Sequence, residues 1–450
     1  MKNTLDYLKL RFTEKYIYIL LIHILIGVFI YEFPFFSKIY AYLILVVGFF
    51  IIVKNKNKNN EVLLVSAYLV GSEVLLRMSY GSPNYEFGKY GIILFAILGI
   101  YFSIYNKKSR LYLIFILLLI PSLILSFFVL KTSFRQRIIF DILGPLSLAI
   151  FSIYTFKRPI NIEQLNNILF LIGLPILSTC IFLFMFSFSI NDIYFITQSS
   201  AIFSGNYGPN QVATILGLGL FIFFTRLIFK SQLLFHLFIN LFVTFYFGYR
   251  CLLTFSRGGM LTALVIILFF ILLLILDFKS YKKYHLKSKL IFCLLAFFSI
   301  FFLTAFESKG IIIKRYANED TRGIAQDEPK YIRKKIIIRE FQKFIENPIF
   351  GIGVGKGKEE SLKELGKEVS THCEITRMLS EHGVFGSIAL LILILTPLLL
   401  FYENSNNIYF FSFYLFWLLT ISHSGMRLAA PSFLYALSLL NISDKKYNQG

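Results

Sequence analysis

Long apolar runs recur along the whole chain and decide its fold class. From Tyr16 onward, stretches of roughly 17 or more residues carry almost no charge, and each can cross a hydrocarbon core of about 30 Å as a helix. Apolar residues make up 57% of the 450 residues and charged residues only 16%, so too little polar surface remains to cover these segments in water. The sequence therefore predicts an all-α, polytopic integral membrane protein.

The apolar runs predict 14 membrane-spanning helices, with 12 as the alternative. The first run follows no cleavable signal peptide and is expected to stay as a span. The expected starts are Tyr16, Ile39, Glu61, Tyr90, Leu111, Ile138, Leu165, Gln211, Leu233, Met260, Leu290, His382, Ile408 and Ala430.

The formal net charge of +20 reflects topology and gives no indication of a nucleic-acid partner. Lys and Arg lie mostly in short loops between the apolar runs, without a basic domain of their own. Cytoplasmic loops collect positive charge, and a cytoplasmic N-terminus puts the loops richest in Lys and Arg inside. This alternation favours an even number of spans, with the N- and C-termini both in the cytoplasm.

One segment interrupts the succession of spans. The sequence predicts three regions: 1–306 with transmembrane helices 1–11, a large periplasmic loop over 307–377, and 378–450 with helices 12–14. The loop contains a predicted helix from Tyr331 to Ile345, which Asn347-Pro348 and a glycine-rich turn follow. Long loops in compact proteins are usually functional. We therefore expect this loop to carry functional residues.

His372 is the candidate catalytic residue of the loop. Thr371 and Glu374 have the spacing of a capping box, which predicts a helix start with His372 at the first helical position. The helix dipole at that place disfavours a positive imidazole, and a neutral histidine can act as a general base. The alternative is a histidine at a membrane-surface turn without a catalytic role.

Two arginines are candidates for binding an anion. Arg257 lies at the outer end of a predicted span, within Ser256-Arg257-Gly258-Gly259, and Arg333 lies in the predicted helix of the loop. Guanidinium groups bind phosphate oxygens bidentately and keep their charge. The alternatives are an interfacial anchor for Arg257 and a solvated helix face for Arg333. The turn that starts at Gly351 has neither dinucleotide-binding nor P-loop spacing.

Charged residues inside the apolar runs leave further questions open. Glu73 and Arg77 are four residues apart, so a helix brings them onto one face, where they can pair. Charges within a membrane are functional hypotheses by default, although a self-contained pair can equally be structural. Asp141 and Arg427 are similar open cases. The four cysteines have unrelated spacings and predict neither a metal site nor a disulfide framework.

Several short motifs follow one another in a fixed order in the second half of the chain. Phe203-Ser204-Gly205 leads to Pro209-Asn210 before one span, and Thr254-Phe255-Ser256-Arg257-Gly258-Gly259 opens another. Arg333 precedes Asn347-Pro348-Ile349-Phe350-Gly351-Ile352-Gly353, and His372 is followed by Gly383 and Gly386. Over residues 200–390 this series resembles the O-antigen ligase and polymerase superfamily of bacterial surface-polysaccharide assembly. The chain departs from the family in having Cys373 where an Asn is usual, and Ile337 where a Trp is common.

The resemblance implies a membrane glycosyltransferase of the bacterial cytoplasmic membrane that needs no metal or other cofactor. Its donor is a glycan on undecaprenyl diphosphate, and its acceptor is a growing glycan or lipid A–core. His372 takes the proton of the acceptor hydroxyl, which attacks the sugar C1 with inversion, while Arg257 and Arg333 stabilise the departing diphosphate. Further expected partners are membrane lipid and other polysaccharide-assembly proteins. The alternatives are a lipid-linked oligosaccharide flippase and another polysaccharide transporter.

Overall fold

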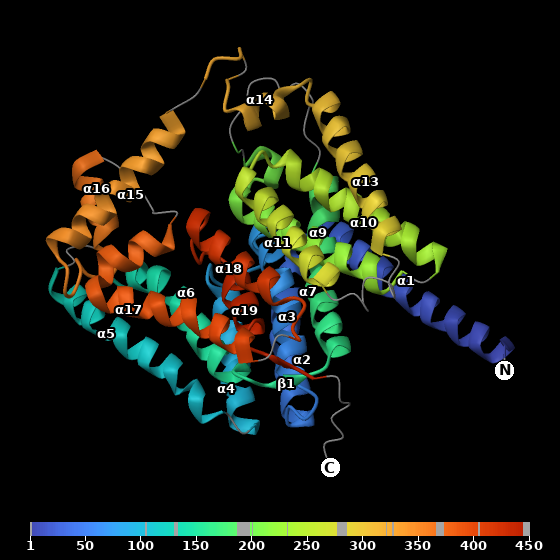
Figure 1. Cartoon of the computed structure of the whole chain (residues 1–450), viewed down its shortest axis with the longest axis horizontal. Coiled ribbons are helices and arrows are strands. Elements are labelled where there is room, and N and C mark those ends of the chain that lie inside the picture. Colours follow the sequence, from blue (N-terminus) through green and yellow to red (C-terminus); the bar gives the residue numbers. More distant parts are fainter. Residues whose placement is uncertain are drawn as a thin grey trace. The chain divides into compact units, whose positions relative to one another are not determined.

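In the residues that it describes, the computed structural model is all-α apart from one pair of very short strands (Figure 1). The structure describes residues 2–103, 106–129, 134–186, 199, 201–231, 233–276, 286–320, 322–325, 328–365, 373–403 and 406–443. The prediction of an all-α polytopic membrane protein is confirmed.

The predicted number of 14 spans is wrong. Within the described residues, nine helices are long and apolar enough to cross a membrane. They are Lys15–Glu32 in α1 (Lys2–Glu32), α2 (Phe35–Asn55), Lys107–Phe128 in η1 (Lys107–Arg110) and α5 (Leu111–Val129), Ile138–Thr155 in α6 (Phe134–Thr155), α7 (Ile162–Met185), α9 (Pro209–Phe229), α10 (Leu234–Leu253), α11 (Arg257–Leu276) and α17 (Glu374–Glu403).

The other five predicted spans fail for physical reasons. The helix α3 (Glu61–Met78) has 18 residues but includes Glu61, Glu73 and Arg77. The helices α4 (Phe87–Phe102), α18 (Phe410–His423) and α19 (Ala429–Leu437) have 16, 14 and 9 residues, which is shorter than the roughly 20 that a span needs. In α13 (Leu286–Glu307), only Phe297–Glu307 stands out as an apolar helix, and it too is short. The sequence analysis placed both termini in the cytoplasm because it predicted an even number of spans, and that argument therefore no longer holds.

The described helices form two compact units, each with its own packing. The first unit comprises Met1–Gly48, Leu63–Tyr85 and Asn166–Ile324. Its central helix is α9, which is buried over most of its length and packs on α10 and α11. The α9–α11 contact is close, because a Cβ added at Gly259 would lie 2.6 Å from Cβ of Ala213. Small residues allow such close approach between helices in a membrane. The short elements η2 (Ile202–Ser204) and α14 (Ile311–Ala317) also belong to this unit.

The second unit comprises Phe49–Val62, Glu86–Leu165 and Ala325–Gly450. Here α6 packs against α4, α5 and α19, while α17 packs against α5, α18 and the loop helix α15 (Glu328–Glu346). A further loop helix is α16 (Lys356–Leu365). The parallel strands β1 (Pro159–Ile160) and β2 (Asn441–Ile442) pair at one end. The core contains Trp417 and the hydrogen-bonded pair Tyr112 and Tyr435, whose hydroxyls are 2.9 Å apart.

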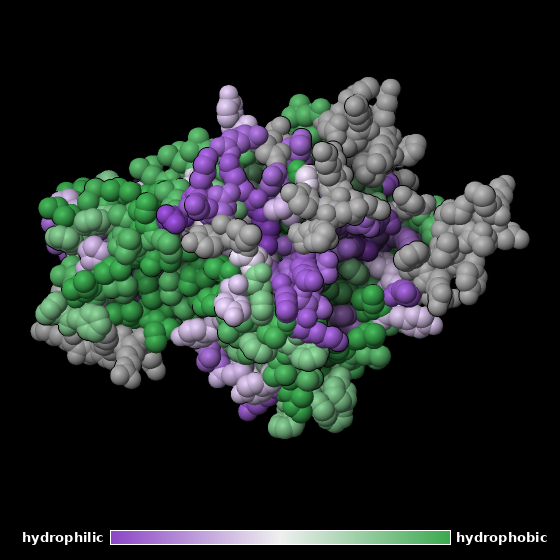
Figure 2. Space-filling model, turned by 90° about the horizontal axis from the view of Figure 1, so that it is seen from below, coloured by the Kyte–Doolittle hydropathy of each residue, from purple (hydrophilic) through white to green (hydrophobic). Residues whose placement is uncertain are grey.

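The surface of the described residues fits a hydrocarbon environment. Figure 2 shows a broad hydrophobic area on the side where Figure 1 places α5. On α5, Leu117, Ile124, Phe127 and Phe128 are all exposed. In water such an apolar surface would be an aggregation hazard, whereas in a bilayer it faces lipid.

Candidate functional site

The glycine-rich turn after α15 fits into a break in α17. The break is at Gly383, which has φ 62° and ψ −138° and so interrupts the helical hydrogen bonds. The turn contains Gly351, Gly353 and Gly355, all with positive φ, a conformation that glycine adopts without steric cost. The glycine-rich turn and the break in α17 therefore both have backbone conformations that favour glycine.

Backbone hydrogen bonds from the turn replace those that α17 loses at the break. The amide of Ile352 donates to the carbonyl of Ser380 at 2.9 Å, and that of Gly353 donates to the carbonyl of Glu381 at 3.2 Å. In return, the amide of Val384 donates to the carbonyl of Pro348 at 2.7 Å. Buried backbone groups need such partners, particularly near the hydrocarbon region. The Asn-Pro…Gly-x-Gly motif and the Gly383 region thus form one local structure.

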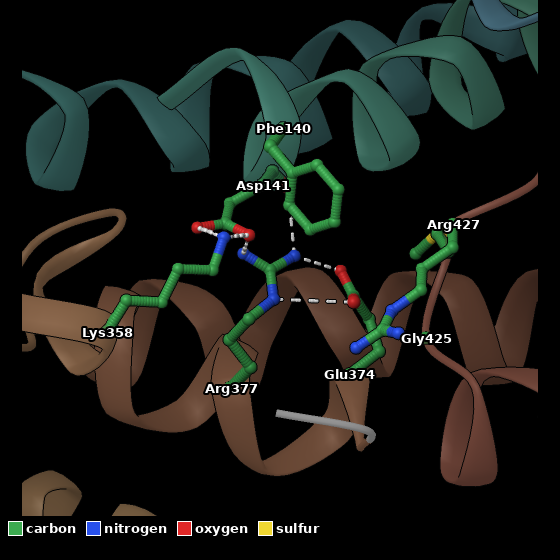
Figure 3. A pocket seen from close by; sticks show the side chains of 8 residues that line it. Phe140, Asp141, Lys358, Glu374, Arg377, Gly425 and Arg427 are labelled. Atoms are coloured by element: carbon green, nitrogen blue, oxygen red, sulfur yellow. Dashed lines mark hydrogen bonds and ion pairs between the residues drawn. The ribbon is translucent and has the colours of Figure 1, made fainter. Parts of the chain in front are cut away.

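A buried cluster of charges surrounds the first two turns of α17 (Figure 3). Arg377 Nη1 lies 2.7 Å from Glu381 Oε2, and Arg377 also pairs with Glu374. On its other side, Arg377 Nη2 donates to the backbone carbonyl of Asp141 on α6 at 2.8 Å. Figure 3 shows the guanidinium between α17 and α6. Arg377 therefore ties the start of α17 to α6.

Lys358 on α16 joins the same cluster. Its Nζ lies 2.7 and 2.9 Å from the two carboxylate oxygens of Asp141, and 4.1 Å from the centroid of the Phe140 ring. Glu381 Oε1 also accepts a hydrogen bond from the amide of Gly355 at 2.9 Å. The cluster therefore links α6, α16, α17 and the glycine-rich turn, so that the loop is fixed against the membrane helices at several points.

A water-sized cavity of about 20 Å³ lies within this charge cluster. It is lined by Phe140, Asp141, Lys358, Glu374, Arg377, Gly425, Met426 and Arg427. Asp141 and Arg427, two of the charges that the sequence left open, thus line one cavity. Within the described part of the chain, no group of three or more His, Cys, Asp or Glu side chains is arranged to hold a metal ion.

Arg377 offers a direct test of the cluster. An Arg377→Met substitution leaves the carboxylates of Glu374 and Glu381 buried without their main partner, which typically costs about 3–5 kcal/mol. We expect a clear loss of thermal stability for the purified full chain in detergent, measured by a fluorescence melt. The matched control is Arg322→Met, which removes an exposed arginine from an ion pair with Asp320 and should change the melting temperature little. Equal melting temperatures for the two variants would contradict the assigned role.

His382 follows the cluster directly and is a structural residue. It is only 1% exposed, and its Nδ1 is hydrogen-bonded to the hydroxyl of Ser122 on α5. One turn further along α5, Ser126 donates to the carbonyl of Val354 at 3.2 Å. Its burial leaves His382 no access to a bulky acceptor sugar, so it is a poor general-base candidate.

In the first unit, the structure brings two of the sequence motifs together. Ser256 donates through its hydroxyl to Asn210 Oδ1 at 2.8 Å, and its amide donates to Thr254 Oγ1 at 3.2 Å. Phe255 between them has a φ of 54°, which is uncommon for a bulky residue and marks a tightly constrained turn. The Pro209-Asn210 motif and the Ser-Arg-Gly motif therefore support each other.

Arg257 is the first residue of α11 and contacts the end of α14. Among the described residues, its guanidinium donates long hydrogen bonds to two neutral oxygens: 3.4 Å to the carbonyl of Arg315 and 3.5 Å to Asn318 Oδ1. Among the described residues, no carboxylate forms an ion pair with Arg257. Its positive charge is thus available to an anion.

The predicted pair of Glu73 and Arg77 is confirmed, with Arg77 Nη2 lying 2.6 Å from Glu73 Oε1. Arg77 also donates to the Tyr207 hydroxyl at 3.1 Å and to Gln211 Oε1 at 3.2 Å, while its guanidinium lies 4.2 Å from the Tyr85 ring centroid. Tyr207 and Gln211 flank Pro209-Asn210. The pair therefore holds the start of α9 in place.

The structure describes two of the three predicted site residues, Arg257 and Arg333. Arg257 lies at the start of α11, and Arg333 lies in α15, which confirms the predicted helix over 331–345. His372 lies outside the described residues. The first helical residue that the structure describes in α17 is Glu374. The carboxylate of Glu374 pairs with Arg377 on its own helix, which the capping-box spacing does not reveal.

The sequence interpretation missed the charge cluster. Its members on α17 are Glu374, Arg377 and Glu381, whose spacing of three and four residues puts an acid, a base and an acid on one helical face. This pattern lies directly before an apolar run and could have signalled buried pairing. The pairing of Lys358 with Asp141 has no comparable signal, because 217 residues separate them.

The apolar helices define a polytopic membrane protein. Its loop is structured, and paired charges fix that loop beside the start of the span α17. A comparison with protein families matches residues 241–391 to the O-antigen ligase family. Residues 241–391 of this membrane protein are accordingly similar to the O-antigen ligase family. No curated protein and no solved structure matches the chain significantly. The matched segment contains Arg257, Arg333, His372 and the glycine-rich turn.

Proposed function

We propose that this enzyme transfers a glycan from undecaprenyl diphosphate to a sugar hydroxyl at the outer face of the bacterial cytoplasmic membrane. The observation that carries the proposal is the O-antigen ligase match over residues 241–391, which includes all three predicted site residues. The acceptor is a growing glycan or lipid A–core. The region 307–377 is then a periplasmic loop.

Each of the three residues has its own chemical task. His372 removes the proton from the acceptor hydroxyl as the oxygen attacks C1 of the donor sugar, so the C1–O bond to the diphosphate breaks with inversion. Arg257 and Arg333 stabilise the negative charge on the departing diphosphate. A well-placed electrostatic group of this kind is worth about 3–4 kcal/mol. The absence of a paired carboxylate at Arg257 among the described residues supports its role.

The competing function is transport of the lipid-linked glycan across the bilayer. A flippase moves the donor without forming a new glycosidic bond. It has no need of a general base or of a segment fixed to the membrane helices by a buried charge cluster. The family match favours the enzyme.

Reconstitution tests the proposed function directly. The purified full chain in proteoliposomes is given an undecaprenyl-diphosphate-linked oligosaccharide and, in separate reactions, lipid A–core or a free glycan acceptor. We expect a product with inverted anomeric configuration by NMR, and an unchanged rate when a chelator is added. Movement of the donor across the bilayer without any transfer product would instead establish the transporter. Retention of configuration or inhibition by the chelator would overturn the mechanism.

A further inference from the structure

The loop helix α15 has one face packed against the protein and one exposed face. The inner face carries Ile336 and Glu340, each 8% exposed. Glu340 accepts a hydrogen bond from the hydroxyl of Thr376 in the first turn of α17. The orientation of α15 about its own axis is therefore fixed, and its other face is directed away from α17.

The exposed face of α15 contains an apolar stripe. At 100° per residue, Ile337, Phe341, Ile345 and Ile338 fall within one arc of the helix. These side chains are between 42% and 62% exposed. An extramembrane helix bathed in water would not expose so much contiguous apolar surface.

This stripe continues onto a membrane span. Directly after α15, Ile349 and Phe350 are 58% and 51% exposed. The Phe350 ring stacks on that of Phe385 in α17, with centroids 5.7 Å apart and an interplanar angle of 21°. Next to Phe385, the exposed side of α17 carries Val384, and Ile388 follows one turn later. The apolar surface thus runs from α15 through the Phe350–Phe385 contact onto the lipid-facing side of the span.

We propose that α15 lies in the membrane surface, with Ile337, Ile338, Phe341 and Ile345 inserted among phospholipid chains, and that the loop is anchored to the bilayer beside α17. The occupant is bilayer lipid, because the stripe is continuous with the exposed apolar side of α17, a helix long and apolar enough to cross a membrane. Interfacial amphipathic helices bury their apolar face about 5–10 Å into the boundary between headgroups and chains.

The charges of α15 agree with this position. Lys334 and Lys335 are exposed near the N-terminal end of the stripe. Long basic side chains can keep their charge at the headgroup level while their aliphatic stems cover apolar surface. Both residues can therefore contact lipid phosphates. Gln342 is exposed and polar and lies about 100° round the helix from Phe341, outside the stripe.

Tryptophan fluorescence tests the proposal on the full chain in vesicles. The wild-type protein has a single tryptophan, Trp417, which is buried and supplies the background. A Phe341→Trp variant places a reporter in the middle of the stripe, and the matched control Gln342→Trp places one about 100° round the same helix, outside the stripe. The vesicles contain phosphatidylcholine and phosphatidylglycerol, with or without bromine on the upper part of the acyl chains.

After subtraction of the wild-type signal, we expect brominated lipid to quench the Phe341→Trp reporter several-fold more than the Gln342→Trp reporter. Acrylamide in the water should show the opposite order. Strong acrylamide quenching of both reporters would show that the stripe faces water and would overturn the proposal. Protection of the Phe341→Trp reporter from both quenchers would also overturn it, because another protein surface would then cover the stripe.

Discussion

Replacing His372 with alanine is expected to abolish glycan transfer while leaving the fold intact. If His372 is the general base, its loss removes a contribution of about 10²–10⁴ to the rate. In cells, the lipid-linked donor should accumulate at the outer face of the membrane, because delivery continues and consumption stops. The measurements are transfer rates with the purified protein and the sidedness of the donor in intact cells.

The control for this variant is a histidine outside the proposed machinery. His236→Phe keeps an aromatic ring against Tyr16, with which His236 makes an edge-on contact at 5.2 Å, and it should retain transfer. Donor trapped on the inner face of the His372→Ala cells would point to a transporter. Normal polysaccharide in those cells would exclude His372 as the catalytic base.

Replacing Gly383 with alanine is expected to destabilise the protein strongly. Its φ of 62° and ψ of −138° form a backbone conformation that side chains rarely tolerate, and a Cβ there would lie 2.5 Å from the carbonyl oxygen of Ile349. Strain of this kind costs about 1–3 kcal/mol, and overpacking adds about as much again. The thermal melt of the purified full chain should shift to a clearly lower temperature.

A glycine without these constraints provides the comparison. Gly357 lies in the first turn of α16, and an added Cβ there would meet nothing within 4 Å, so Gly357→Ala should be neutral or slightly stabilising. Gly351→Ala should resemble Gly383→Ala, because a Cβ at Gly351 would lie 2.6 Å from the amide nitrogen of His382. If Gly383→Ala melts like Gly357→Ala, the turn and the break in α17 do not depend on each other.

Sequence reasoning predicted the features that depend on local composition and spacing. It gave the membrane class, the helix over 331–345, the glycine-rich turn after it and the pairing of Glu73 with Arg77. Each of these follows from hydropathy, helical periodicity or the conformational freedom of glycine, which neighbouring residues determine.

The errors arose where tertiary packing decides the outcome. Short apolar helices such as α18 and α19 look like spans in the sequence, although their helical parts are too short to cross a bilayer. The charge cluster was missed because Asp141 comes together with Lys358 and Arg377 only in the folded chain. A residue that looks isolated in an apolar run can thus have distant partners that neutralise it.

The hydrogen bonds between the glycine-rich turn and α17 restrict how a substrate can gain access. If the turn moved away as an independent lid, the backbone groups of Ser380, Glu381 and Val384 would lose their partners at the edge of the hydrocarbon layer. Such groups cost several kcal/mol each when they are left without partners in an apolar medium. Opening and closing would therefore have to carry the turn and the start of α17 together as one rigid body.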